Sequence, residues 1–163
     1  MDESGSTTNG TQAEFPRGRY PGRLDDKGRL KLPAAFAQFF SGLPEKKLYL
    51  TSLDRRIAQL YPIAEWRTNE KFFDNHTANP AAARSISFNA QDLGADVEPD
   101  AQGRITVHPD LRRELAMEGT ELHLMTEKGH LQILTDAIYQ ERKREAQDRA
   151  AEYLDLLQRD GLR

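Results

Sequence analysis

The chain has no cysteine among its 163 residues, which excludes disulfides and thiolate metal sites. It also has no run that approaches the roughly 20 apolar residues of a membrane helix. The sequence contains no phosphate-binding glycine loop and no nucleophile elbow, and its histidines lack the spacing of metal ligands. We therefore expect no enzyme activity, cofactor, metal, membrane partner or small-molecule substrate, and a cytoplasmic location.

The length and composition suit one ordinary domain or two small ones. Hydrophobic residues make up 37% of the chain and charged residues 30%, which is typical of a water-exposed protein with a modest core. Residues 1–14 are polar or acidic with almost nothing to bury, so we expect a disordered N-terminal arm there.

The charge is unevenly distributed. The net charge of −3 argues against a nucleic-acid partner for the chain as a whole. Residues 15–36, however, hold six Lys or Arg side chains against two Asp, a local balance of +4. Such a segment is either a basic face that meets phosphates or a solvated loop with scattered arginines, and the charge pattern by itself fits both.

An internal repeat gives the strongest signal. Residues 25–36 and 100–111 both read Asp-x-x-Gly-Arg, then alternating apolar residues, then a proline that opens a helix-like run. The constant shift of 75 predicts two copies of one supersecondary unit that share a core. The matched pairs are Asp25 and Asp100, Gly28 and Gly103, and Arg29 and Arg104.

Each motif is predicted to form a tight hairpin turn between two short strands, with the glycine supplying a positive φ. The two aspartates are interpreted as turn-capping residues that accept backbone N–H bonds and pair with the motif arginine. In the first copy Leu30 alternates with Arg29 and Lys31, so one strand face is apolar and the other basic.

The remaining pattern fills in the rest of each unit. Strands are expected near residues 48–50, 57–60, 122–124 and 131–133, and prolines 33, 62, 80 and 109 are expected at helix starts. The stripe of Phe36, Phe39 and Phe40 is expected in the core. Residues 136–160 are predicted to form one long charged helix that Gly161 ends, with a thin apolar stripe for a domain surface or a neighbouring subunit.

Three segments together resemble a known family. They are Arg17 to Tyr20 with Leu24 to Pro33, the Leu-Tyr-Pro-x-x-x-Trp segment from Leu60 to Trp66, and Asp100 to Ile105 with Pro109 and Leu111-Arg112. They resemble the motifs of the MraZ family of bacterial transcriptional regulators, which contain two SpoVT/AbrB-like half-domains. The resemblance covers roughly residues 15 to 139.

The resemblance implies a mixed, mainly β fold. The expected architecture is a pseudo-twofold, swapped-hairpin β-barrel made from two repeats, with peripheral helices and a long C-terminal helix. The implied organisation is a disordered arm (1–14), repeat 1 (15–66), a helical connector (67–93), repeat 2 (94–139) and a C-terminal helix extension (140–163).

The resemblance also implies a function. The expected activity is sequence-specific binding of double-stranded DNA at repeated promoter boxes of the division and cell-wall gene cluster. The expected form is a ring-shaped homo-oligomer that usually represses and is associated with the nucleoid. The first repeat, which is richer in cations, is expected to contact DNA. The DNA-binding candidates are Arg17, Arg19, Lys27, Arg29, Lys31 and Arg104, and the structural turn residues are Asp25, Gly28, Asp100 and Gly103.

The sequence leaves an alternative from a different class. A protein-interaction or antitoxin-like module of the AbrB superfold would use its C-terminal helix to bind a partner protein, with DNA contact secondary. The net acidity and the charged helix favour this alternative. Salt dependence separates the two, because binding to DNA phosphates weakens steeply as salt is added.

Overall fold

The computed structural model describes residues 14–163, so the predicted arm lies outside the described residues except for Glu14. Two four-stranded units follow each other along the chain. The first contains β1 (Arg19–Gly22), β2 (Arg29–Lys31), β3 (Leu48–Thr51) and β4 (Ala58–Pro62). The second contains β5 (Ala95–Val97), β6 (Arg104–Thr106), β7 (Leu122–Glu127) and β8 (His130–Thr135).

Helices occupy equivalent places in the two units. In the first, α2 (Ala34–Ser41) follows β2, and in the second α5 (Pro109–Glu114) follows β6. The connector contains α3 (Ile63–Asn75) and α4 (Pro80–Asp92). The prolines mark helix starts as predicted: two are the first residues of α4 and α5, and two immediately precede α2 and α3.

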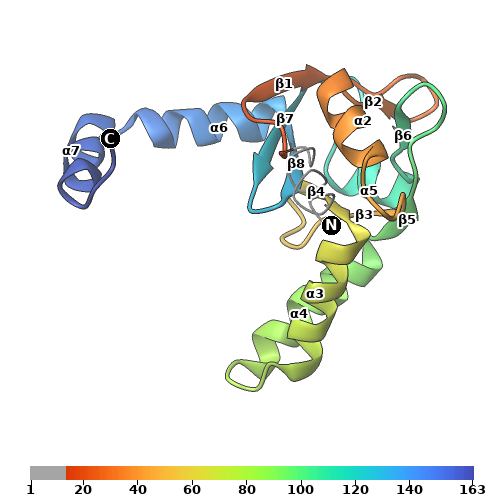
Figure 1. Cartoon of the computed structure of the whole chain (residues 1–163), viewed down its shortest axis with the longest axis horizontal. Helices are drawn as coiled ribbons and strands as arrows, with labels where there is room; N and C mark the ends of the chain where they lie inside the picture. Colours follow the sequence, from red (N-terminus) through yellow and green to blue (C-terminus); the bar gives the residue numbers. More distant parts are fainter. Residues whose placement is uncertain (1–13) are drawn as a thin grey trace, which may run out of the picture.

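The strands of the two units interleave. An antiparallel six-stranded sheet has the order β1-β7-β8-β4-β3-β5, and β2 pairs with β6 in a separate two-stranded ribbon. The order reads the same from either end when each strand is exchanged for its counterpart. The first strand of each unit thus pairs with the third strand of the other unit (Figure 1). The two predicted hairpins are wrong. Only an isolated bridge between Leu24 and Leu30 joins the segments of β1 and β2, and β5 and β6 lie in different sheets.

The predicted closed barrel is not found within residues 14–163. The six-stranded sheet ends at β1 and β5, which do not pair with each other. The physical reason is that β2 and β6 have three residues each and use their ladder bonds on one another, so they do not bridge the two edges. The fold is mixed α and β, with antiparallel pairing in both sheets.

Both units contribute to one main core. Leu30 and Phe36 from the first unit pack in the same cluster as Ile105 and Leu111 from the second, and all four are fully buried. Phe40 is buried and Phe39 is half-buried at its edge, which confirms the core assignment of the aromatic stripe. The ribbon therefore covers the core with one face and leaves the other face to the solvent.

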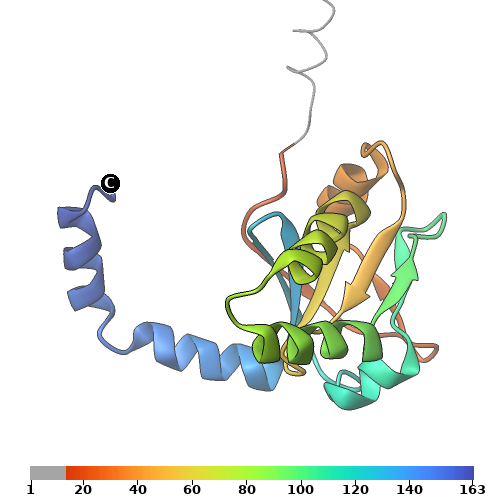
Figure 2. The ribbon, with the colours of Figure 1, turned by 90° about the horizontal axis from the view of Figure 1, so that it is seen from below.

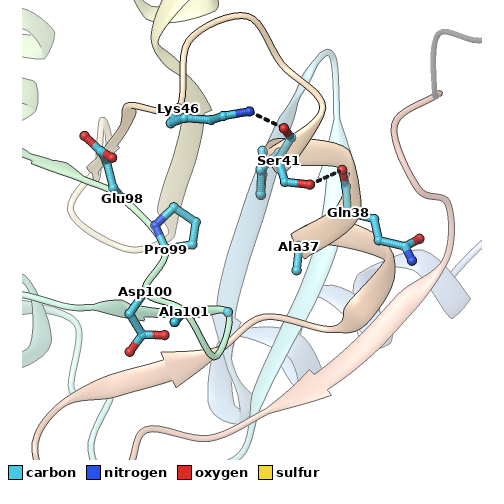
Figure 3. Close-up of a pocket in the computed structure, with 10 residues that line it drawn as sticks. Ala37, Gln38, Ser41, Lys46, Glu98, Pro99, Asp100 and Ala101 are labelled. Atoms are coloured by element: carbon cyan, nitrogen blue, oxygen red, sulfur yellow. Dashed lines mark hydrogen bonds between the residues drawn. The ribbon is translucent and has the colours of Figure 1, made fainter.

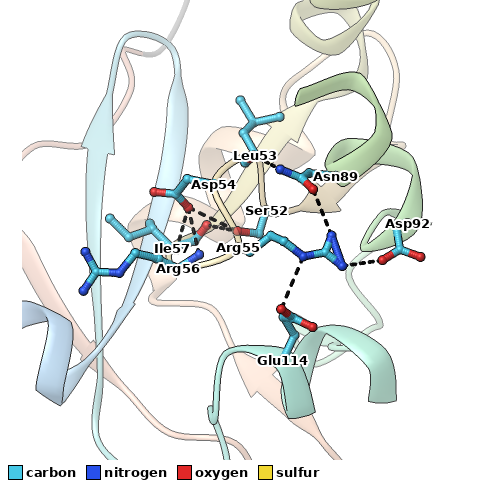
Figure 4. A network of polar contacts seen from close by, with 9 residues as sticks. All are labelled: Ser52, Leu53, Asp54, Arg55, Arg56, Ile57, Asn89, Asp92 and Glu114. Carbon is cyan, nitrogen blue, oxygen red and sulfur yellow. Dashed lines mark hydrogen bonds and ion pairs between the residues drawn. The ribbon is translucent and has the colours of Figure 1, made fainter. Parts of the chain in front are cut away.

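Arg55 links the connector to both four-stranded units through hydrogen bonds. It lies in the β3–β4 hairpin, and its guanidinium donates to Asn89 Oδ1 at 2.9 Å, Asp92 Oδ2 at 2.5 Å and Glu114 Oε2 at 3.3 Å (Figure 4). Because these acceptors lie on α4 and α5, one side chain joins the hairpin, the connector and the second unit. Arg55 has a φ of 60°, and the Asp54 carboxylate, which accepts the Arg56 and Ile57 N–H groups, stabilises that turn.

The predicted single C-terminal helix is wrong, because the chain breaks at Asp148 and Arg149. The structure has α6 (Asp136–Gln147) and α7 (Ala150–Arg159), which extend away from the sheet (Figures 1 and 2). Arg149 takes a left-handed φ of 59°, and its guanidinium binds Glu152 at 2.7 Å and lies over the Tyr153 ring. These local contacts stabilise a new helix start in place of continuation. Gly161, with φ 120°, follows α7, as predicted for a helix stop.

No helix of the described chain is both long enough and apolar enough to cross a membrane.

Candidate nucleic-acid interface

The first turn (residues 25–29) and the second turn (residues 100–104) have the same hydrogen bonds. In the first turn Asp25 Oδ1 accepts the N–H groups of Lys27 at 2.9 Å and Arg29 at 2.8 Å, and Oδ2 accepts Arg29 Nε at 2.8 Å. In the second turn Asp100 makes the same three bonds at 2.9, 2.9 and 2.8 Å. The glycines have φ values of 77° and 76°, so both turns need the left-handed backbone that favours glycine.

These bonds stabilise the ionised carboxylates. The N–H of Arg29 is the largest cause of a lowered pKa for Asp25, and the N–H of Arg104 has the same effect on the pKa of Asp100. Both aspartates therefore stay charged and hold the Nε of the neighbouring guanidinium. Among the described residues, the terminal nitrogens of Arg29 and Arg104 have no hydrogen-bond partner, which leaves both terminal nitrogens of each guanidinium for a ligand.

The ribbon brings three predicted cations together. Its register places Arg29 opposite Thr106, Leu30 opposite Ile105 and Lys31 opposite Arg104. Because side chains alternate along a strand, the leucine and isoleucine enter the core while the three cations share the outer face. Lys31 and Arg104 carry the same charge in directly opposed positions, and the Asp100 carboxylate that holds Arg104 Nε offsets part of their repulsion.

Main-chain bonds beyond the ribbon tie the turns to each other. Leu32 N–H donates to the Gly103 carbonyl at 2.9 Å, and Val107 N–H donates to the Gly28 carbonyl at 2.8 Å. Each turn is thus anchored to the strand of the other repeat. The cationic face is consequently held by the core of both repeats and not by a flexible loop.

The other predicted DNA-binding residues lie in different settings. Lys27 is exposed at the tip of the first turn, beside the ribbon. Arg17 forms an exposed ion pair with Glu14. Arg19 lies in the six-stranded sheet, where it contacts His123 Nδ1 at 3.0 Å and the Tyr139 ring. The structure therefore groups Lys27, Arg29, Lys31 and Arg104, and it does not bring Arg19 to the ribbon.

Sequence reasoning placed Arg112 in the second motif segment but gave it no role at the site, whereas the structure places it against the first turn. Its guanidinium covers Gly28, where an added Cβ would lie 2.7 Å from Arg112 Cζ. Arg112 Nε donates to the Val107 carbonyl at 2.8 Å, and Nη1 donates to Glu118 at 2.8 Å. The repeat could have pointed to this residue, because the shift of 75 aligns Arg112 with the much smaller Ala37 of the first repeat.

One polar cluster away from the ribbon has the composition of a metal site. Ligand atoms of Glu121, His123 and Asp136 lie within 4.8 Å of one another. However, His123 Nδ1 faces a guanidinium that can only donate, so the proton is assigned to Nε2, which donates to Asp136 Oδ1 at 2.9 Å. A metal on Nε2 would move this proton toward Arg19, so the cluster fits a hydrogen-bond chain from β1 to α6 better than a metal site.

The fold and the ribbon define a class of small protein in which two interleaved repeats share a core and expose a cationic two-stranded ribbon. No protein-family model matches the chain. Curated relatives do match, and those described next carry the name transcriptional regulator MraZ. The relative from Acidobacterium capsulatum is 33% identical over 118 residues, which cover 72% of this chain and 80% of that protein. The Koribacter versatilis relative is 38% identical over 72% and 78% of the two chains.

A third relative, from Mycobacterium sp. (strain KMS), is 32% identical over 124 residues, which cover 76% of this chain and 83% of that protein. Matches at this level of identity over most of both chains establish the family. The chain belongs to the MraZ family of transcriptional regulators.

Proposed function

We propose that the chain is a sequence-specific DNA-binding transcriptional regulator that presents the β2–β6 ribbon to double-stranded DNA. The observation that carries this proposal is the register that places Arg29, Lys31 and Arg104 on one solvent-facing side. A two-stranded ribbon has the dimensions to enter the major groove. Arginine can bond a guanine edge with two donors, while lysine suits phosphates.

The geometry supports specific roles. Asp25 holds Arg29 through Nε at 2.8 Å and leaves its terminal nitrogens for a base edge. Lys27 and Lys31 lie on either side of Arg29 in the sequence and are exposed, which suits contacts to the flanking phosphates. The second turn supplies only Arg104 as a motif cation, so the first repeat is the main DNA contact in this proposal.

The finer expectations of the family resemblance are also part of the proposal. The strand exchange between repeats is proposed to be the swapped-hairpin arrangement, with the domain limits given above. One ribbon neutralises few phosphates and binds weakly on its own. A ring-shaped homo-oligomer would place several ribbons against repeated promoter boxes and gain affinity through avidity. Repression of the division and cell-wall gene cluster and association with the nucleoid complete the proposal.

The test is a titration with the chain's own upstream promoter DNA and with a scrambled duplex, each at two salt concentrations. We expect preference for the promoter and weaker binding at the higher salt. Arg29→Ala is expected to weaken promoter binding by about 1–3 kcal/mol if a base contact is lost. The matched control is Arg142→Ala, which removes an exposed arginine from α6, away from the ribbon. Equal promoter affinity for the Arg29 variant, in the same assembly state as the parent chain, would overturn this role.

A second function is favoured by one observation. The short helix α7 exposes about half of the Tyr153, Leu154 and Leu157 side chains. Such a face suits a protein-interaction or antitoxin-like module in which a partner protein covers it. Equal, weak binding to promoter and scrambled DNA would favour this function, whereas promoter preference that survives removal of residues 150–163 would exclude it as the main role.

A further inference from the structure

A hollow of about 370 Å³ lies between α2 and the second turn. One wall contains Ala37, Gln38, Ser41 and Lys46, and the other contains the segment from Glu98 to Gly103 (Figure 3). Its volume falls within the range of about 300–1,000 Å³ that is usual for ligand pockets. The first turn offers an internal comparison that shows what such a space accommodates.

At the first turn, the equivalent space is filled by the side chain of Arg112. Its guanidinium lies over Gly28 and donates to the Val107 carbonyl and to Glu118, both at 2.8 Å, and the side chain is only 18% exposed. The repeat aligns Gly28 with Gly103 and Arg112 with Ala37. The Ala37 Cβ lies 3.6 Å from the position of a Cβ on Gly103, so the alanine takes the arginine's place but not its volume. The hollow is therefore the space that an arginine occupies in the other half of the molecule.

One charge beside the hollow has the opposite sign to its counterpart at the first turn. The repeat aligns Glu98 with Arg23, so a carboxylate replaces a cation at this place. Within residues 14–163, Glu98 is exposed and forms no ion pair, which leaves its carboxylate available. Lys46 is the one cation among the lining residues, and its ammonium donates to the Ser41 and Leu43 carbonyls at the end of α2.

We propose that this hollow binds an arginine side chain presented by another polypeptide. The guanidinium would lie over Gly103 as that of Arg112 lies over Gly28, and Glu98 would supply the carboxylate that Glu118 supplies at the first turn. Arginine fits because its planar fork gives a carboxylate two parallel bonds and its aliphatic stem packs against apolar walls, here Ala37 and Pro99. The site is separate from the cationic ribbon and does not depend on DNA binding.

The probe is a capped Gly-Arg-Gly peptide, with a Gly-citrulline-Gly peptide of the same shape but no charge as its comparison. Saturation-transfer NMR on the full chain suits weak ligands whatever the size of the assembly. We expect transfer to the arginine peptide and much less to the citrulline peptide. Equal transfer to both would overturn the proposal. Equally tight binding of free arginine amide would also overturn it, because the site would then select a small cation and not a polypeptide.

Two variants locate the binding. Ala37→Arg should fill the hollow as Arg112 fills its counterpart and should abolish transfer. The matched control is Ala35→Arg, which adds the same charge at an exposed position of α2. Glu98→Gln changes an exposed side chain and should weaken binding several-fold, so it keeps the test decisive even if Ala37→Arg does not fold. Unchanged binding in folded Ala37→Arg or in Glu98→Gln would contradict the proposed site.

Discussion

The two Asp-x-x-Gly-Arg turns have the same backbone and the same three aspartate bonds, yet their surroundings differ at almost every other position. Where the first turn has Lys27, the second has Gln102, and where the first strand has Lys31, the second has Thr106. The motif residues therefore set the shape of the turn, while the intervening residues set the charge that each turn presents. One repeat offers cations outward, and the other offers a hollow beside a carboxylate.

The largest effect should follow from giving the first turn the side chains of the second. In the double variant Lys27→Gln with Lys31→Thr, we expect promoter binding to weaken and the slope of log K against log salt to become shallower by about two units, one for each phosphate contact. Filter binding at four salt concentrations measures this slope. The control is Lys143→Gln on α6. An unchanged slope in the double variant would mean that the turns do not differ in their phosphate contacts.

A second comparison concerns the two glycines, and its effect should be smaller. Alanine at either position would have to adopt a positive φ, which costs about 1–2 kcal/mol of the free energy of unfolding. Gly28→Ala should cost more than Gly103→Ala, because its Cβ meets the Arg112 guanidinium at 2.7 Å while the other meets only Ala37 at 3.6 Å. Urea denaturation measures both. Relative to Arg112→Ala alone, the double variant Gly28→Ala with Arg112→Ala should show no added cost from the side-chain clash. Equal losses for Gly28→Ala and Gly103→Ala would contradict this account.

The smallest effect concerns pH, and here the turns should behave alike. The pKa values of Asp25 and Asp100 are both lowered in the folded chain, with a main-chain N–H bond as the largest cause. An aspartate whose pKa is lower in the folded chain stabilises the fold. This stabilisation is fully present above the unfolded pKa of about 3.9 and is lost as the pH falls below that value. Asp25→Asn and Asp100→Asn should each weaken the dependence of the melting temperature on pH between pH 5 and pH 3, as measured by circular dichroism. A flattening in only one variant would show that the turns differ in their aspartates after all.

Much of the local structure follows from the sequence. The glycines predicted the positive φ values, the aspartates their main-chain bonds, and the prolines the helix starts, because each of these depends on atoms only a few residues away. The aromatic stripe of α2 was predicted to lie in the core for the same reason, since helical spacing places Phe36 and Phe40 on one face. The break at Arg149 was missed, because a polar helix gives little periodic signal by which to locate its interruption.

The candidate site shows the same division. Alternation identified Arg29 and Lys31 as one strand face, but nothing local showed that Arg104 would lie opposite Lys31 or that Arg19 would contact His123. The barrel and the two predicted hairpins were wrong for a related reason. Each short strand could pair with several others of similar pattern, and a two-stranded hairpin alone is marginal in water.

The repeated unit, the chemistry of its turns and the uneven charge between its two copies therefore follow from the sequence alone. The partner of each strand depends on the tertiary structure, and so do the cationic face of the ribbon and the hollow beside Gly103. The reason is that turn geometry is fixed by bonds over four residues, whereas strand pairing is chosen by the core that both repeats must bury together.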